Sequence, residues 1–353
     1  MKMPSPLRLV DPDPLPPDFD EALYLEAHAD VREAVAAGGF ASAAAHYRAF
    51  GRSEGRSLRP AFMRVVRNVP ELDAEIEHLR ELERRSFSEW LRARASFRFQ
   101  EDIKALPSDP FSSAYRLAQM ELYEQIAGVT GYNPWKAEPV PISVKDAVDP
   151  HPFPFSTQDG ELIGGHMVAI GNILRTMWGI KPGGGHRILE YGCGTGFSTI
   201  TLAASRYQVT AVDINADALK VIDTLAAARG LKVTTFNGEF GSIPDESQKF
   251  DIILFYESFH HCLDFIPLLG KLHDQLAPDG TILFAGEPIF NDFPKPWGLR
   301  LDGASLWEIR TKGWLELGFR EDFFLRVLAE TGWEGKKLMF PGSPDMFVAH
   351  RSP

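Results

Sequence analysis

The stretch His186-Arg-Ile-Leu-Glu190-Tyr-Gly192-Cys-Gly194-Thr-Gly196-Phe-Ser-Thr-Ile200 joins an apolar strand pattern directly to a helical one. Glycine has no Cβ, so this loop can turn tightly and its backbone can approach a ligand closely. In an open α/β sheet the first strand-to-helix turn is also a place where ligands bind. The stretch therefore predicts a ligand site at the carboxyl edge of a mostly parallel sheet.

Short apolar strands and amphipathic helices alternate after this loop, which is typical of a parallel sheet covered by helices on both faces. The expected strands are 186–191, 208–213, 232–236, 250–256, 280–285, 336–340 and 345–350, and the expected helices are 197–205, 216–229, 262–276 and 321–331. We expect an α/β fold with a doubly wound, mostly parallel seven-strand sheet that ends in an antiparallel hairpin. An α-helical N-terminal region precedes it.

Four details indicate which ligand the loop binds. Phe197 stands where a dinucleotide fingerprint has its third glycine, which disfavours a pyrophosphate, although nicotinamide and flavin sites share such loops. Glu190 stands two residues before the first glycine and suits a cation. Asp213 ends the second strand, where a carboxylate can accept hydrogen bonds from both ribose hydroxyls. The stretch Asn237-Gly-Glu-Phe240 could hydrogen-bond the edge of an adenine and pack an aromatic ring over it.

Through these residues, the region from about 160 to 353 resembles the class I methyltransferases, whose glycine loop has the form Glu/Asp-x-Gly-x-Gly-x-Gly. The resemblance implies the cofactor S-adenosyl-L-methionine, with its methionine part along the glycine loop and its ribose on Asp213. A nicotinamide enzyme and a Rossmann-like domain that binds nothing are the alternatives. The expected cofactor-binding residues are Glu190, Gly192, Gly194, Gly196, Asp213, Ile214, Gly238, Glu239 and Glu257.

The methyl acceptor is expected above the carboxyl ends of the fourth and fifth strands. His260 and His261 follow the fourth strand, and either could take the proton of an acceptor hydroxyl near neutral pH. They could equally cap the helix or contact the cofactor. Glu287 follows the fifth strand and completes the expected catalytic set, because a charge at the end of a buried strand is costly unless the site uses it.

A metal site is a weaker alternative. Glu257, Glu287 and Asp292 could offer oxygen ligands to Mg²⁺. Metal-dependent methyltransferases carry an Asp-Asn pair after the fifth strand, whereas this chain has the reverse order, Asn291-Asp292. We therefore predict no bound metal.

A tryptophan-rich insertion over residues 289–319 is longer than an ordinary connection, and we interpret it as a lid. Its indole, guanidinium and carboxylate groups could stack on and hydrogen-bond a polyhydroxylated ring. Trp314 is expected to anchor the insertion in the core, and His166 could close the site from the other side. The expected acceptor-binding residues are His166, Trp297, Arg300, Asp302 and Arg310.

The N-terminal half divides into a flexible proline-rich lead (1–17), a small helical module (18–60) and a helical linker or cap region (61–159). The module resembles a short unit of bacterial surface-glycan proteins through Tyr24-Leu, Asp30-Val, His46-Tyr, Phe50-Gly and Glu54-Gly-Arg. Leu72, Ile76, Leu79 and Leu82 form an apolar stripe on a helix expected over 70–104. That stripe could pack on the chain's own catalytic domain or mediate self-association.

Composition excludes several function classes. A formal charge of -11 over 353 residues argues against a nucleic-acid partner held through phosphates. Two cysteines, Cys193 and Cys262, cannot build a disulfide framework and suit a cytoplasmic setting. No stretch of 18 apolar residues or secretory leader occurs, so no membrane span is expected.

Together these observations predict a methyltransferase that moves a methyl group from S-adenosyl-L-methionine to a small polar acceptor. A hydroxyl of a sugar or glycan intermediate is the preferred acceptor, because of the tryptophan-rich insertion and the resemblance of the N-terminal module to a unit of glycan proteins. A carbon or nitrogen atom of another small metabolite is one alternative. A non-catalytic binding or scaffold protein that retains the fold is another.

Overall fold

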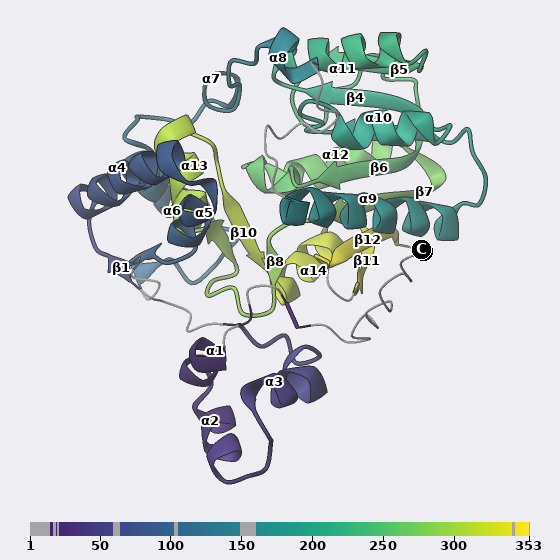
Figure 1. The fold of residues 1–353 in the computed structure, drawn as a ribbon. Helices are drawn as coiled ribbons and strands as arrows, with labels where there is room; N and C mark the ends of the chain where they lie inside the picture. Colours follow the sequence, from purple (N-terminus) through teal and green to yellow (C-terminus); the bar gives the residue numbers. More distant parts are fainter. Residues whose placement is uncertain are drawn as a thin grey trace, which may run out of the picture.

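The computed structural model describes residues 15–16, 19, 21–58, 64–101, 105–148, 160–340 and 343–352. A seven-stranded sheet with the order β11-β12-β7-β6-β3-β4-β5 forms the centre of its C-terminal half (Figure 1). The strands are β3 (Arg187–Tyr191), β4 (Gln208–Asp213), β5 (Val233–Asn237), β6 (Phe250–Tyr256), β7 (Leu276–Ala285), β11 (Trp333–Leu338) and β12 (Met346–Arg351).

The pairing of the strands confirms the predicted fold class. Strands β3 to β7 pair in parallel, whereas β12 runs antiparallel to both β7 and β11. The parallel strands need crossover helices, which the alternating pattern of the sequence supplies. Strand β7 begins at Leu276, four residues earlier than expected, and its pairing with β6 contains an irregularity between Phe250 and Ile252.

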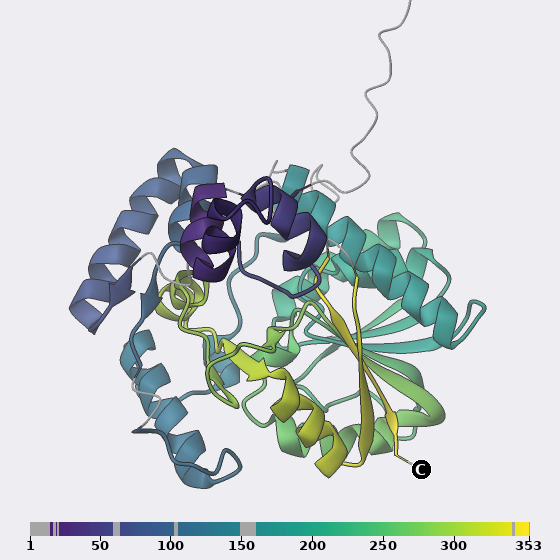
Figure 2. The same cartoon turned by 90° about the horizontal axis from the view of Figure 1, so that it is seen from below.

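Helices cover both faces of the sheet (Figures 1 and 2). Helices α9 (Gly160–Ile180), α10 (Phe197–Ala204) and α11 (Ala216–Ala228) cover one face, and α12 (Phe265–Gln275) and α14 (Glu321–Glu330) cover the other. Successive residues of a strand point to opposite faces, so Ile188 packs with the α9 side and Leu189 with the α12 side. Burial on both faces explains the continuous apolar runs of these strands.

The insertion over 289–319 is folded, and together with helices from the N-terminal half it forms a second body beside the central sheet. It contains β8 (Ile289–Phe290), β9 (Trp297–Leu299), α13 (Gly303–Lys312) and β10 (Leu317–Arg320), which form a three-stranded sheet and one helix. They pack with β1 (Val65–Val66), α4 (Val69–Arg85), α5 (Phe87–Arg94), β2 (Arg98–Phe99) and α6 (Ser113–Ala127). One apolar core runs through this body and the α12 side of the central sheet.

The single helix expected over 70–104 is wrong. Helix α4 ends at Arg85, and Ser86 accepts a hydrogen bond from the backbone N–H of Glu89 to cap the next helix, α5. The chain is extended again in β2, and residues 102–104 lie outside the described part. The apolar stripe of α4 is buried within the chain's own core. It is therefore not available for self-association with a second copy.

The N-terminal module consists of α1 (Glu21–Ala27), α2 (Ala29–Ala36), α3 (Ala43–His46) and η1 (Tyr47–Gly51). It has a small core of its own around Tyr24, Val31, Ala43 and Tyr47, and it lies below the rest of the chain in Figure 1. Apart from Leu15 and Pro16, the proline-rich lead lies outside the described residues. Among the described helices, none has the length and apolarity needed to cross a bilayer.

Candidate functional site

A cavity of about 1020 Å³ lies at the carboxyl ends of β3, β4, β5 and β6. The glycine loop and the strand ends form one side. The other side comes from residues 132–143, called the strap below, which contain α7 (Pro134–Ala137) and lead into α8 (Val144–Val148). Helix α8 packs against α11, so the strap runs from the helical body to the far edge of the sheet (Figure 1).

The glycine loop turns at three left-handed positions, with φ of +66° at Gly192, +51° at Gly194 and +86° at Gly196. A Cβ on Gly192 would lie 2.5 Å from the Ser258 Cβ, and one on Gly196 would lie 2.4 Å from the side chain of Ile222. A Cβ on Gly194 would meet no atom within 4 Å. Two glycines are therefore needed for packing, and the third leaves open space over the cavity.

This difference predicts separate effects for two matched substitutions. Gly192→Ala adds a steric clash to the unfavourable φ, so we expect it to lower the free energy of unfolding by about 2–4 kcal/mol. Gly194→Ala carries only the φ penalty, about 1–2 kcal/mol, but places a methyl group where a ligand would approach. Thermal unfolding and ligand titration of both variants test this. Equal stability losses would contradict the packing argument.

Asp213 lies at the cavity and also braces the glycine loop. Its carboxylate accepts the backbone N–H of Gly194 at 2.8 Å and that of Asn215 at 2.7 Å. Burial raises the pKa of Asp213 although these two hydrogen bonds favour its charged form. The side chain thus links the end of β4 to the loop and keeps a carboxylate edge beside the cavity.

Glu190 lies beneath the glycine loop and outside the cavity. Its carboxylate accepts hydrogen bonds from the hydroxyls of Ser198 and Thr199, which begin α10, and the side chain is buried. Burial raises the pKa of Glu190 to about 7, against the effect of these hydrogen bonds. The placement corrects the expectation that Glu190 faces a bound cation: it ties β3 to α10.

Other residues expected to bind the cofactor line the same cavity. Ile214 and Gly238 line the cavity next to Glu239, and Phe240 lies beside them. The Glu239 carboxylate accepts a hydrogen bond from the indole N–H of Trp135 in the strap. The ends of β4 and β5 and the strap therefore meet at this part of the cavity.

Glu257 follows β6 and faces the cavity. Its φ of +50° makes it one of two non-glycine residues with a left-handed backbone in the described part, a conformation that clusters at functional sites. Burial, and then repulsion by Glu287, raise the pKa of Glu257 to about 7. Beside it, the Tyr256 hydroxyl lies 2.5 Å from the Nδ1 of His166, whose pKa burial lowers. Both of these also line the cavity.

Of the two histidines that follow β6, His261 is the one that lines the cavity. Its Nδ1 lies 3.3 Å from an oxygen of Glu138, a residue of the strap. Burial lowers the pKa of His261, but Glu138 and then Glu316 and Glu287 outweigh it and raise the pKa to about 9. The imidazole thus stands next to a carboxylate that stabilises its charged form.

His260 and Glu287 form a buried pair away from the cavity, which corrects their expected catalytic roles. Glu287 accepts the backbone N–H groups of Ser258, Phe259 and His260 at 2.8, 2.9 and 3.1 Å, and the Nδ1 of His260 at 2.8 Å. Burial opposes its ionisation, yet these donors outweigh burial and lower the pKa of Glu287. Glu287 therefore positions the turn that carries His261.

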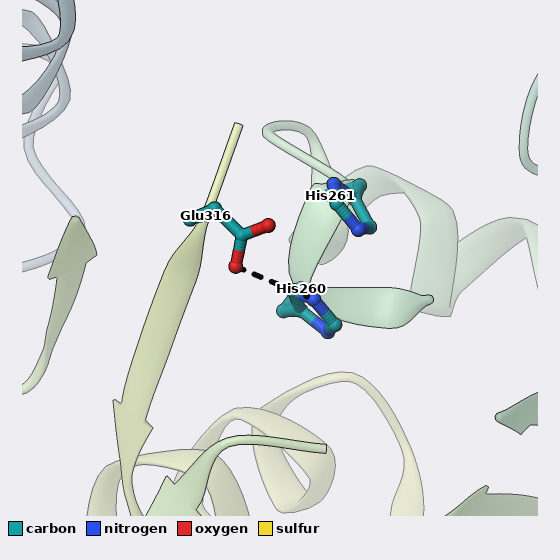
Figure 3. A group of neighbouring side chains, drawn as sticks. All are labelled: His260, His261 and Glu316. Carbon is teal, nitrogen blue, oxygen red and sulfur yellow. Dashed lines mark ion pairs between the residues drawn. The ribbon is translucent and has the colours of Figure 1, made fainter. Parts of the chain in front are cut away.

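Figure 3 shows His260, His261 and Glu316 close together, with one possible ligand atom from each within 4.8 Å of the others. Glu316 lies 3.7 Å from the Nε2 of His260 and 3.5 Å from Arg300. Cationic partners therefore already surround this carboxylate. The Mg²⁺ alternative built on Glu257, Glu287 and Asp292 is not supported, because Glu287 uses both oxygens on backbone amides and His260.

The expected acceptor-binding residues of the insertion do not line the cavity. Trp297 is buried, and its indole N–H donates to the carbonyl of Pro110 at 2.8 Å. Arg300 pairs with Asp302 at 3.2 Å, and Asp302 also caps α13. Arg310 pairs with Asp73 of α4 at 2.8 Å. These residues join the insertion to its neighbours instead of facing a substrate.

Several cavity residues were not identified from the sequence. Trp314, expected in the core, is the tryptophan of the insertion that lines the cavity. The strap residues lie in a proline-rich stretch without periodicity, so no sequence signal placed them at the site. The position of Tyr256 and Ser258 at a strand end could have identified them. The unforeseen lining includes Arg116, Tyr132, Glu138, Asn215, Tyr256, Ser258, Lys271 and Trp314.

The sheet order and the glycine loop of the C-terminal part are similar to those of class I methyltransferase domains. Residues 188–280 match the family described as a methyltransferase domain. A ubiquinone biosynthesis O-methyltransferase of Chelativorans sp. is 30% identical over 159 residues, which cover 43% of this chain and 60% of the relative. One from Ruegeria pomeroyi is 26% identical over 126 residues, covering 36% and 50%. The chain thus spans 50–60% of the length of these relatives.

Among solved structures, the 1,6-didemethyltoxoflavin-N1-methyltransferase of Burkholderia thailandensis aligns with a TM-score of 0.41 at 18% identity. The alignment covers 61% of this chain and 93% of that one. The magnesium protoporphyrin IX methyltransferase of Synechocystis aligns with a TM-score of 0.42 at 13% identity, over 60% and 99%.

Proposed function

We propose that the protein is an S-adenosyl-L-methionine-dependent methyltransferase that acts on a hydroxyl of a small molecule. The observation that carries the proposal is that one cavity joins the glycine loop and Asp213 to His261 and Glu138. The first pair suits a nucleoside cofactor. The second suits removal of a proton from an acceptor.

The residues present fit the cofactor. The open space over Gly194 would admit its methionine part, and the carboxylate of Asp213 would hold its ribose. Gly238, Glu239 and Phe240 would surround the adenine. When bound, the cofactor supplies an electrophilic methyl group on a sulfonium. The side chain of Glu257 lines the cavity, and its carboxylate would complement the positive charge.

His261 would hold the acceptor and take up its proton. With Nδ1 directed to Glu138, the neutral imidazole offers Nε2 as an acceptor for the hydroxyl hydrogen. The cofactor would supply the methyl group to the acceptor oxygen, and Nε2 of His261 would take up the hydroxyl proton. Trp314 and the strap would keep bulk water from this end of the cavity.

Two classes of hydroxyl acceptor are considered, a sugar or glycan hydroxyl and an aromatic hydroxyl. The sugar or glycan hydroxyl rests on the resemblance of residues 18–60 to a glycan-protein module, because Trp297, Arg300, Asp302 and Arg310 lie away from the cavity. An aromatic hydroxyl is favoured by the aromatic lining, which includes Tyr132, Phe240 and Trp314. The names of the relatives, ubiquinone biosynthesis O-methyltransferases, point the same way. Two free, buried cysteines support the cytoplasm as the proposed location.

The proposal is tested by calorimetry with S-adenosylmethionine and by release of S-adenosylhomocysteine with panels of phenols and sugar nucleotides. We expect saturable binding and turnover with members of one panel. Turnover only with carbon or nitrogen acceptors would replace the hydroxyl assignment. Saturable binding of NADH with no heat from S-adenosylmethionine would overturn the class of reaction. Cofactor binding without turnover on any acceptor would favour the scaffold alternative.

Asp213→Ala should weaken binding of S-adenosylmethionine by at least about tenfold, since it removes the ribose acceptor and loosens the loop at Gly194. The matched control is Asp223→Ala on α11, whose carboxylate accepts the Thr235 hydroxyl at 2.9 Å away from the cavity. Calorimetry on both variants, with circular dichroism to verify folding, gives the answer. Equal affinities would remove Asp213 from the cofactor site.

A further inference from the structure

The strap connects the N-terminal half of the chain to the cavity. The Asn215 side chain donates to the carbonyl of Val140 at 2.8 Å, next to Asp213. The indole of Trp135 donates to Glu239, also in the cavity wall. The strap lies outside residues 188–280, the part that matches the methyltransferase family. Part of this site therefore comes from a region that the domain match does not include.

Glu138 is the most firmly held residue of the strap. One carboxylate oxygen, Oε1, accepts the Tyr132 hydroxyl at 2.7 Å and the backbone N–H of Leu315 at 3.0 Å. Its carbonyl accepts the indole N–H of Trp314 at 2.8 Å. The other oxygen, Oε2, lies 3.3 Å from the Nδ1 of His261. Two donors thus hold the carboxylate and a third holds the backbone of Glu138, and its second carboxylate oxygen lies beside the imidazole.

His261 is also held on its other sides. Its backbone carbonyl lies 3.4 Å from the Tyr132 hydroxyl, and its ring packs edge-on against Trp314, with centroids 5.7 Å apart. The ring of His260 lies 4.3 Å away, centroid to centroid. Little freedom is left to the imidazole except at the ring atoms that face the cavity.

The charged groups around His261 come from five elements. They are Glu138 in the strap, Glu316 before β10, Glu287 after β7, Asp213 at the end of β4, and the neighbouring His260. Among the carboxylates of the described residues, only that of Glu138 lies within 4 Å of an imidazole nitrogen of His261. Glu287 and Glu316 instead lie within that distance of His260.

We propose that Glu138 is the positioning residue of His261: it takes the Nδ1 hydrogen and leaves Nε2 directed to the acceptor. The inference rests on the proposed function and deepens it, because it places part of the acceptor site in the N-terminal half. Methyltransferase domains without this strap would need another partner for the histidine. Two strap residues then form part of the acceptor end of the cavity as well as supporting proton removal by His261. They are Tyr132 and Glu138, whose carbonyl accepts the indole N–H of Trp314.

The experiment is an NMR titration of protein labelled with ¹⁵N and ¹³C histidine, which needs neither acceptor nor turnover. The His261 signal is assigned by its loss in His261→Asn. In the wild type we expect a midpoint well above that of a free histidine and, once neutral, a hydrogen on Nδ1. In Glu138→Gln the midpoint should fall by about one pH unit or more. Glu138→Asp, which keeps the charge, should stay closer to the wild type.

Glu124→Gln is the matched control. Glu124 accepts the backbone N–H of Gly131 at 2.9 Å at the start of the same connection, away from the cavity. It should leave the His261 midpoint unchanged. Coinciding midpoints in the wild type and Glu138→Gln, or an Nε2 hydrogen in the neutral wild type, would overturn the proposal. Because the titration needs no methyl transfer, its outcome is independent of whether the proposed reaction is observed.

If Glu138→Gln fails to fold, Tyr132→Phe provides a second readout. It removes one of the donors that hold Glu138 and retains both carboxylate and imidazole. Its expected effect is a smaller downward shift of the same midpoint, and no shift would again contradict the proposal. Where turnover is found, the acid limb of the rate profile should move with the NMR midpoint in each variant.

Discussion

Methyl transfer to a hydroxyl acceptor is expected to fall by about 10²–10⁴-fold in His261→Asn, the usual contribution of a general base. Asparagine keeps a polar side chain of similar length beside Glu138 but cannot accept and hold the proton. Binding of S-adenosylmethionine should change little, since the glycine loop and Asp213 are untouched. Steady-state rates and calorimetry on the same preparations separate the two quantities.

The pH dependence of the wild type adds a second readout to this prediction. The pKa of His261 is raised to about 9, so its neutral, proton-accepting form increases as the pH rises toward that value. The rate should therefore fall as the pH is lowered from about 9 to 7. A sulfonium in the same cavity would disfavour the charged imidazole and move this limb to lower pH.

The control for this substitution is His78→Asn, an exposed histidine on α4. It should leave both the rate and its pH profile unchanged. A full wild-type rate in His261→Asn would remove the residue from the reaction. In that case Glu257, a cavity carboxyl group whose pKa is raised to about 7, becomes the candidate to substitute next.

Glu287→Ala is expected to destabilise the fold by about 3–5 kcal/mol, because it leaves the buried His260 imidazole and several backbone donors without an acceptor. Three amides and the His260 imidazole all donate to this one carboxylate. The turn that carries His261 should loosen with them. Denaturant unfolding of the wild type and the variant gives the difference.

The lowered pKa of Glu287 determines how its contribution to the free energy of unfolding changes with pH. Its contribution to stability is present above the pKa of an unfolded glutamate, about 4.3, and is lost as the pH falls through the lower folded value. The variant should therefore show a weaker loss of stability in acid than the wild type. Glu83→Ala, at an exposed site on α4, is the control and should change stability by less than about 0.5 kcal/mol. A comparable loss in both variants would contradict this role.

The sequence by itself determined the strands of the central sheet and the proposed cofactor end of the site. The strand positions, the antiparallel hairpin and the turn at Gly192 follow from local patterns: apolar runs, alternation with amphipathic helices and glycines at left-handed positions. Asp213 and Glu239 could be placed because parallel strands end at one edge of the sheet. These features depend on residues that are close in the chain.

Only the tertiary structure decided the acceptor end. Glu138 and His261 are far apart in the sequence, and no periodicity connects a proline-rich strap to the turn after β6. Residue type alone could not distinguish Trp314, which lines the cavity, from Trp297, which packs in the core. Nor could it show that Glu287 is used by the backbone. Such roles depend on which donors and acceptors long-range packing brings together, and a buried charge takes its function from those partners.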